Sequence, residues 1–145
     1  MRFEPIAIVG QGCALPGALS PGALWAAVVE GRDLLTSAPE GSWRISPEHI
    51  MGTPADAADR TWSDRGGYVQ GFDDVFDPQG FSLPADEIAD LGPLVQWSLH
   101  AGRQALDGVK VPDRERSGLI LGNLSYPSAQ MAAWAERIWL GNERA

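Results

Sequence analysis

Few residues of this chain could carry out covalent chemistry. Cys13 is the only cysteine, and His49 and His100 are the only histidines among the 145 residues. A thiolate at Cys13 could form a thioester if a base lay beside it, but neither histidine is close to it in the sequence. A lone cysteine after an apolar run is more often a small buried hydrophobic residue. We therefore expect Cys13 to be structural, and His49 and His100 to be surface or packing residues.

The same three residues limit disulfide and metal chemistry. A single cysteine cannot form an internal disulfide bond, which excludes a disulfide-stapled secreted scaffold. Because the three side chains are far apart in the sequence, a structural zinc site is not expected. We predict no metal site and no cofactor.

Two glycines after an apolar run could suggest a phosphate-binding loop. Gly10 and Gly12 would let backbone N–H groups approach a pyrophosphate. Leu15 stands where that motif has its third glycine, however, and Pro16 would disrupt the helix start that receives the phosphate. We interpret the glycines as a tight turn after a strand. Residues 122–126 read Gly-Asn-Leu-Ser-Tyr rather than G-x-S-x-G, so a serine-hydrolase motif is not supported.

The elements that must hold these residues begin with a strand, a loop and a helix. Short apolar runs at residues 6–9 and 117–122 are typical of strands buried on both faces. Ser20 and Pro21 predict the N-cap and first position of a helix that stops at Gly31. Its apolar residues recur at helical spacing and are Leu24, Trp25, Val28 and Val29.

Three further helices are predicted. Pro84 can start a short helix over residues 85–89, and Pro93 starts a longer one that stops at Gly108. The apolar stripe of the longer helix consists of Leu94, Trp97, Ala101 and Ala105. A last helix, capped by Ser128 and ended by Gly141, carries Met131, Trp134, Ala135, Ile138 and Trp139. The helical tryptophans are expected in the core, and they are Trp25, Trp97, Trp134 and Trp139.

A long irregular stretch, residues 33–79, separates the first two groups of elements and is rich in Pro, Gly, Asp and Ser. Apolar residues recur along it, which implies a loop packed onto other parts of the protein. The order of elements is α/β. Two buried strands are too few for a finished sheet, since such strands need neighbours at their edges and helices on both faces. We therefore expect the chain to be a piece of something larger.

Composition excludes several classes of partner. The net charge is −8 and Lys110 is the single Lys among 11 basic residues, whereas nucleic-acid binding needs clustered Lys and Arg. The apolar run at residues 6–9 is too short for a signal peptide or a membrane span. We expect a cytoplasmic globular protein that binds neither nucleic acid nor membrane.

The run from Ile6 to Ala18 resembles the opening of β-ketoacyl synthase domains, in which an apolar strand leads into a G-x-G-C/A-x-x-P-G stretch. The similarity continues in register along nearly the whole chain. It includes Leu24-Trp25, Gly31-Arg32-Asp33, Trp43-Arg44, Arg65-Gly66-Gly67-Tyr68, Phe76-Asp77-Pro78, Gly80-Phe81, Asp86-Glu87 and the helix at Pro93. Residues 121–128 and 135–141 are most similar to ketosynthases of the polyunsaturated fatty acid synthase type and their polyketide relatives.

The resemblance implies a partial thiolase-like fold, the N-terminal portion of an αβαβα layered ketosynthase that is usually a homodimer. It implies a decarboxylative Claisen condensation, in which an acyl chain on a cysteine is attacked by the enolate of a decarboxylated extender unit. In the family, the nucleophilic cysteine and two histidines come after the strand matched by residues 119–122. Cys13 does not align with that nucleophile, so we expect no catalytic residue in this chain. The implied partners are an acyl carrier protein and the remainder of a synthase.

One departure from the family is Gly92-Pro93, where many ketosynthases have Asp-Pro. Glycine is only slightly weaker than Asp as an N-cap, so we expect the helix to form.

Three functions stay open: a segment of an active ketosynthase, a stand-alone truncated ketosynthase-like protein with an interaction or scaffolding role, and an unrelated small α/β binder. An incomplete sheet would expose apolar surface, so self-association or a partner chain is expected. Carrier proteins are generally acidic, and this acidic chain offers them little basic surface.

Overall fold

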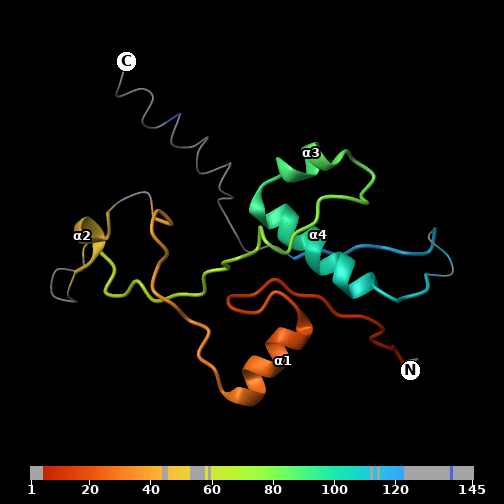
Figure 1. Ribbon diagram of the computed structural model, residues 1–145, viewed down its shortest axis with the longest axis horizontal. Coiled ribbons are helices and arrows are strands. Elements are labelled where there is room, and N and C mark those ends of the chain that lie inside the picture. Colours follow the sequence, from red (N-terminus) through yellow and green to blue (C-terminus); the bar gives the residue numbers. More distant parts are fainter. Residues whose placement is uncertain are drawn as a thin grey trace.

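The computed structural model describes residues 5–43, 46–52, 58, 60–111, 113, 115–122 and 138. Its helices are α1 (Pro21–Glu30), α2 (Pro47–Ile50), α3 (Ala85–Ala89) and α4 (Pro93–Leu106). Figure 1 shows α3 close to α4 and α1 on the other side of the N-terminal segment, whereas α2 lies at the opposite end of the molecule. Apart from Ile138, the helix predicted between Ser128 and Gly141 lies outside the described residues.

Helix α1 begins and ends where its capping residues predict. The Ser20 hydroxyl accepts a hydrogen bond from the Ala23 backbone N–H at 3.2 Å, and Pro21 occupies the first turn. Gly31 adopts a left-handed conformation with φ 64°, which glycine reaches without a steric penalty. The backbone N–H groups after the helix then return to its last carbonyls, as in a Schellman motif. Short-range capping signals are therefore sufficient to define this element.

The predictions for α3 and α4 are confirmed as well. Helix α3 spans Ala85–Ala89, and α4 starts at Pro93 and ends at Leu106, before the left-handed Gly108 (φ 70°). Gly92 is the N-cap of α4 and makes no side-chain capping bond. The helix forms nonetheless, as expected from the small capping difference between Gly and Asp.

The two predicted strands are not formed. Residues 6–9 and 117–122 have no regular secondary structure, and Ile6 and Ile120 are 94% and 98% exposed. A strand needs a neighbour that pairs with its backbone N–H and C=O groups. In the described residues the β pairings are isolated bridges elsewhere, and one of them joins Thr36 and Gly66. The apolar sequence is present at both sites, but no described segment supplies the ladder.

The prediction that the helical tryptophans lie in the core is wrong for Trp25, which is 69% exposed. Helix α1 turns the small Ala27 toward the rest of the protein, where Ala27 is buried. A helix that is apolar on all sides can bury only the side that meets a neighbour. Val28 and Val29 are exposed with Trp25 for the same reason. Trp97 of α4 is half-buried, while Trp134 and Trp139 lie outside the described residues.

Two ties connect distant parts of the irregular stretch between residues 33 and 79. Thr36 and Gly66 exchange backbone hydrogen bonds of 3.1 and 2.9 Å. The Arg65 guanidinium contacts the Asp33 carboxylate at 2.6 Å. Helix α2 lies within this stretch, and so does Phe72, a buried side chain of the small core.

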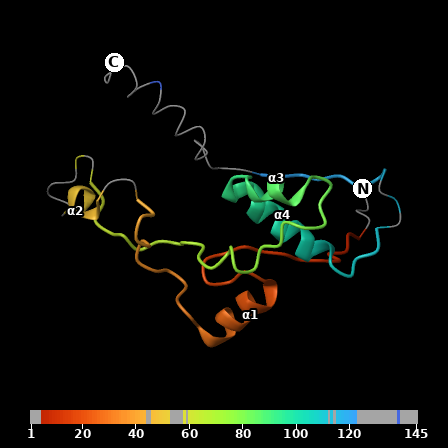
Figure 2. The ribbon, with the colours of Figure 1, turned by 45° about the horizontal axis from the view of Figure 1, so that its top comes forward.

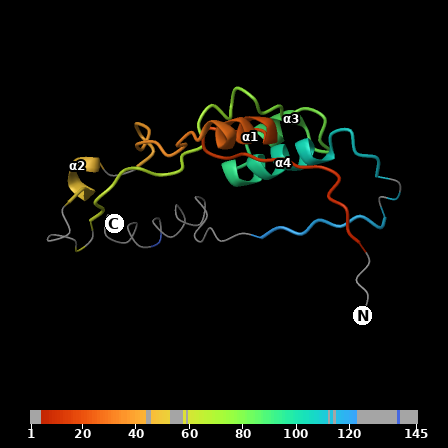
Figure 3. The same cartoon turned by 90° about the horizontal axis from the view of Figure 1, so that it is seen from below.

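The N-terminal segment passes between α1 and α4 in Figures 1 and 2. Figure 3 shows the extended stretch that includes residues 117–121 apart from the helices, which agrees with its exposure. Helix α4 lies at the centre of this arrangement and is contacted from several sides.

In the part of the chain that the structure describes, no helix has both the length and the apolar character needed to cross a membrane.

Candidate functional site

The loop after the first apolar run lies directly on the backbone of α4. A Cβ atom added to Gly10 would overlap the carbonyl oxygen of Ala105, and one added to Gly12 would overlap that of Ala101. Ala101 and Ala105 are four residues apart, so they lie one above the other on one face of the helix. Gly10 and Gly12 are therefore required for close packing of loop and helix. This contact explains the G-x-G spacing more fully than the tight turn predicted from the sequence.

A hydrogen-bond network fixes this loop to α4 through Gln104. The Gln104 side-chain carbonyl accepts a hydrogen bond from the Cys13 backbone N–H at 3.1 Å. Its amide nitrogen lies 2.6 Å from the carbonyl oxygen of Leu19 and 2.6 Å from Nε2 of His100. One side chain thus bonds to the chain on both sides of the turn at residues 15–18. Sequence patterns did not indicate this network, because it joins residues more than 80 positions apart.

Nε2 of His100 has two neighbours in this network. It lies 2.6 Å from the Gln104 amide nitrogen and 2.9 Å from the carbonyl oxygen of Leu19. An amide nitrogen donates and a carbonyl oxygen accepts, so the tautomer of the ring decides which of the two contacts is a hydrogen bond. The ring also lies edge-on to Phe72, with centroids 5.3 Å apart. His100 is thus a packing residue in the arrangement seen, and its Nε2 already has polar neighbours in the network.

The structure places Cys13 and His100 on the same network, although they are distant in the sequence. The Cys13 thiol faces the carbonyl oxygen of Ala18, with Sγ and O 3.8 Å apart. Desolvation by burial raises the pKa of this thiol above its ordinary value. A nucleophilic cysteine needs the opposite shift, because the thiolate is the reactive form. The geometry therefore favours a structural role for Cys13.

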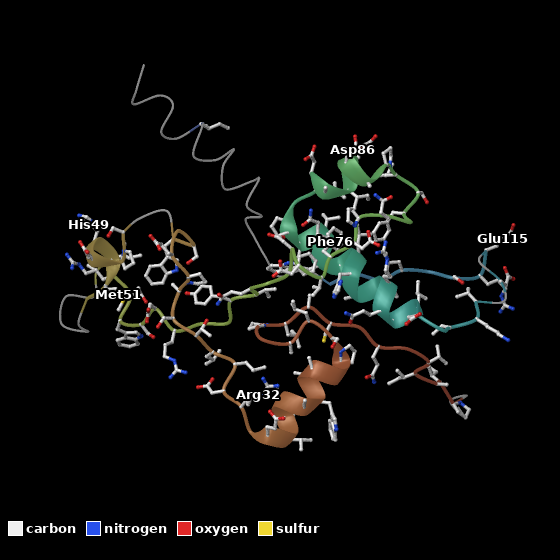
Figure 4. All side chains as sticks on the ribbon, in the orientation of Figure 1. Arg32, His49, Met51, Phe76, Asp86 and Glu115 are labelled. Carbon is white, nitrogen blue, oxygen red and sulfur yellow. The ribbon has the colours of Figure 1, made fainter. Side chains whose placement is uncertain are left out.

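The remaining histidine is not part of this arrangement. His49 lies on α2, and Figure 4 shows it at the far end of the molecule from Phe76 and α4. It is exposed to solvent. Among the described residues, no group of three or more His, Cys, Asp or Glu side chains is placed to hold a metal ion.

An aromatic cluster continues from this network along the same face of α4, at Trp97 and His100. Phe72 stacks on Phe76 with ring centroids 5.1 Å apart and meets Trp97 edge-on at 6.4 Å. Further along the helix, the Arg103 guanidinium lies over the Phe81 ring, 4.1 Å from its centroid. Arg103 also donates to the backbone carbonyls of Asp77 and Gln79. These contacts hold residues 72–81 against α4.

In the described residues, this geometry is a set of loops packed on α4. The comparisons with known proteins identify the family. The model of the β-ketoacyl synthase N-terminal domain matches residues 3–136. The chain belongs to this family.

Several polyketide synthases are relatives of this chain. It is 33% identical over 125 residues to a mycocerosic acid synthase-like polyketide synthase of Mycobacterium tuberculosis. The aligned region covers 83% of this chain and 6% of that protein. It is 32% identical over 142 residues to the erythronolide synthase EryA2 of Saccharopolyspora erythraea, covering 93% of the chain and 4% of that protein. The chain therefore spans only a small part of these relatives.

A solved structure is also similar. The PfaC keto synthase–chain length factor superposes with a TM-score of 0.62 at 31% sequence identity, over 70% of this chain and 11% of that one. This likeness and the family match confirm the resemblance to ketosynthases of the polyunsaturated fatty acid and polyketide types. They agree with a thiolase-like fold, although the described residues here are helical with isolated bridges.

Proposed function

We propose that this chain is the N-terminal scaffold of a ketosynthase that condenses acyl thioesters by decarboxylative Claisen chemistry in polyketide or fatty-acid biosynthesis. In this role it supplies no catalytic side chain. It contributes the loop at residues 10–19 and the helix α4 beneath it, as part of a larger αβαβα layered domain. An acyl carrier protein and other synthase domains would be its partners, and the setting would be cytoplasmic.

The observation that carries the proposal is the family match over residues 3–136, together with the state of Cys13. Covalent condensation needs a thiolate near a group that lowers its pKa. Here burial raises the thiol pKa, and Nε2 of the one histidine on its network faces Gln104 and Leu19 instead. A scaffold role is consistent with both facts.

A second candidate, a non-catalytic interaction protein built on this fold, is supported by the exposed apolar surface. The segments at residues 6–9 and 119–121 expose large aliphatic side chains, and so does the outer face of α1. Soluble monomers seldom leave extensive apolar surface uncovered. Both candidates need a partner at these segments, and they differ in whether the assembled complex condenses acyl thioesters.

Acyl loading tests the assignment of Cys13. We expect no mass increase when the purified chain is incubated with an acyl thioester and measured as the intact protein. A Cys13→Ser variant provides the site control. Iodoacetamide treatment in denaturant should modify Cys13 readily and show that the thiol is chemically intact. Stoichiometric acylation of the native chain that disappears in Cys13→Ser would contradict the scaffold assignment.

A further inference from the structure

We propose that a groove between α4 and the loop at residues 69–73 docks a basic, apolar-anchored peptide segment of a partner protein. This inference does not depend on whether the chain takes part in condensation. It rests on the shape of the groove, on its fixed aromatic floor and on the sign of the charges around it.

The groove has a volume of about 440 Å³ and is open to solvent. Val69, Phe72, Pro93 and Trp97 supply apolar lining, and Gln70, Asp73 and Gln96 supply polar groups. It therefore combines apolar side chains with a substantial share of polar surface, and both kinds of group contribute to recognition. An extended peptide could place an aliphatic or aromatic side chain against Trp97.

The floor is held in place before any ligand arrives. Phe72 is only 6% exposed and contacts the rings of Phe76, Trp97 and His100. On the opposite wall, Gln96 donates from its amide nitrogen to the backbone carbonyls of Ile88 and Ala89, at 3.3 and 2.8 Å. The ring contacts hold the loop against α4, and the Gln96 bonds hold α3 against it. A preformed site loses less conformational entropy when it binds a partner.

The Asp and Glu residues of the stretch that forms the groove have no Lys or Arg among them in the sequence. From residue 66 to residue 102 the sequence contains no Lys and no Arg. The acidic residues of this stretch are all exposed, and they are Asp73, Asp74, Asp77, Asp86, Glu87 and Asp90. Figure 4 shows Asp86 on the outer side of α3. Of the six, Asp77 has an ion-pair partner among the described residues, Arg103 at 3.8 Å.

Charge complementarity identifies the occupant as basic. Asp73 lines the groove. It is held there because its neighbour in the chain, Phe72, is buried. A Lys or Arg on either side of an apolar anchor would meet carboxylates such as Asp73 and Asp74, which have no ion-pair partner among the described residues, and this would increase both the association rate and the specificity. An acidic partner such as an acidic carrier domain would be repelled here. The groove is thus expected to select a different partner surface from a carrier protein.

Fluorescence anisotropy with the full chain tests this inference. The probe is a fluorescein-labelled peptide of about twelve residues in which Lys and Arg alternate with Leu and Trp. We expect saturable binding that weakens about tenfold or more when NaCl is raised from about 50 to 500 mM, because the interaction is between exposed charges. The same peptide with Glu in place of each basic residue should not bind. A peptide that keeps the charges but has Ser in place of Leu and Trp should bind at least about tenfold more weakly.

Surface variants localise the binding without disturbing the core. Asp73→Asn and Asp74→Asn should each weaken binding about two- to fivefold, and the double variant by about their product. Val69→Ser should weaken it through loss of apolar contact. The control is Glu48→Gln on α2, which removes one charge at the far end of the molecule and should leave the affinity unchanged. Equal losses in Glu48→Gln and Asp73→Asn, or no loss in the double variant, would overturn the proposal. So would self-association of the chain that is abolished by Asp73→Asn, because the occupant would then be a second copy.

Discussion

Two sets of apolar residues in this protein behave in opposite ways. Around α4, apolar residues meet partners within the chain: Phe72 meets three aromatic rings, and the glycines of the N-terminal loop lie on Ala101 and Ala105. The runs at residues 6–9 and 119–121 are at least as apolar, yet both are exposed and unpaired among the described residues.

The difference comes from the range over which each kind of structure forms its hydrogen bonds. A helix satisfies its backbone groups within the segment, so α4 needs only one covered face to be stable. A strand satisfies its backbone groups only through another strand. Apolar composition therefore indicates where a segment should be buried, but whether it is buried depends on what lies next to it.

The α4 cluster should be most sensitive at Phe72. Phe72→Ala removes a buried ring and its contacts with three neighbours, and we expect the free energy of unfolding to fall by about 3 kcal/mol. Val75→Ala, in the same turn but about half exposed, should cost about 0.5 kcal/mol or less. Urea unfolding followed by far-UV circular dichroism measures both. Equal losses in the two variants would mean that the cluster is not the core.

The glycine contact with α4 gives the next largest effect. Gly12→Ala places a methyl group against the Ala101 carbonyl, and we expect a loss of about 2 kcal/mol in unfolding free energy. Gly102→Ala is the matched control, because a Cβ there meets no atom within 4 Å. Since alanine favours helix, this control should raise the unfolding free energy by about 0.5–1 kcal/mol. If Gly12→Ala unfolds at the same urea concentration as the natural chain, the close packing of the loop on α4 is wrong.

A smaller effect is expected away from α4, at Asp33. Hydrogen bonds from the Leu35 backbone N–H and from Arg65 lower the pKa of this carboxyl group. Because the folded-state pKa is below that of the unfolded chain, the contribution to stability is complete above the unfolded pKa of about 4 and is lost as the pH falls through the lowered value. Asp33 is exposed, so the change should be slight. An NMR titration in which Asp33 titrates like an unperturbed carboxyl group would remove this tie between residues 33 and 65.

Local signals in the sequence were enough to predict the helices that the structure describes around α4. Ser20, Pro21 and Gly31 defined α1, and the prolines at positions 84 and 93 placed α3 and α4. These signals act within one or two turns of the chain, where capping and proline geometry dominate. The family was also identified from the sequence, because its short motifs occur in a fixed order.

Contacts between distant residues could not be predicted in the same way. The bonds of Gln104 to Cys13 and Leu19 depend on how the loop lies on α4, and so does the position of Arg103 over Phe81. The prediction for Trp25 was wrong because helical spacing shows which residues share a face, but not which face is covered. The predicted strands were not found because their pairing depends on a neighbouring segment.

Sedimentation velocity tests the contrast between the two regions most directly. We expect the apolar residues around α4 to have their partners within the chain, and the apolar segments at residues 6–9 and 119–121 to need a partner. Residues 1–145 should then sediment as associated species whose size increases with concentration. A chain carrying Ile8→Ser and Ile120→Ser should associate less and keep the circular dichroism spectrum of the natural chain, because both side chains are exposed. A natural chain that stays a monomer at every concentration would contradict the account.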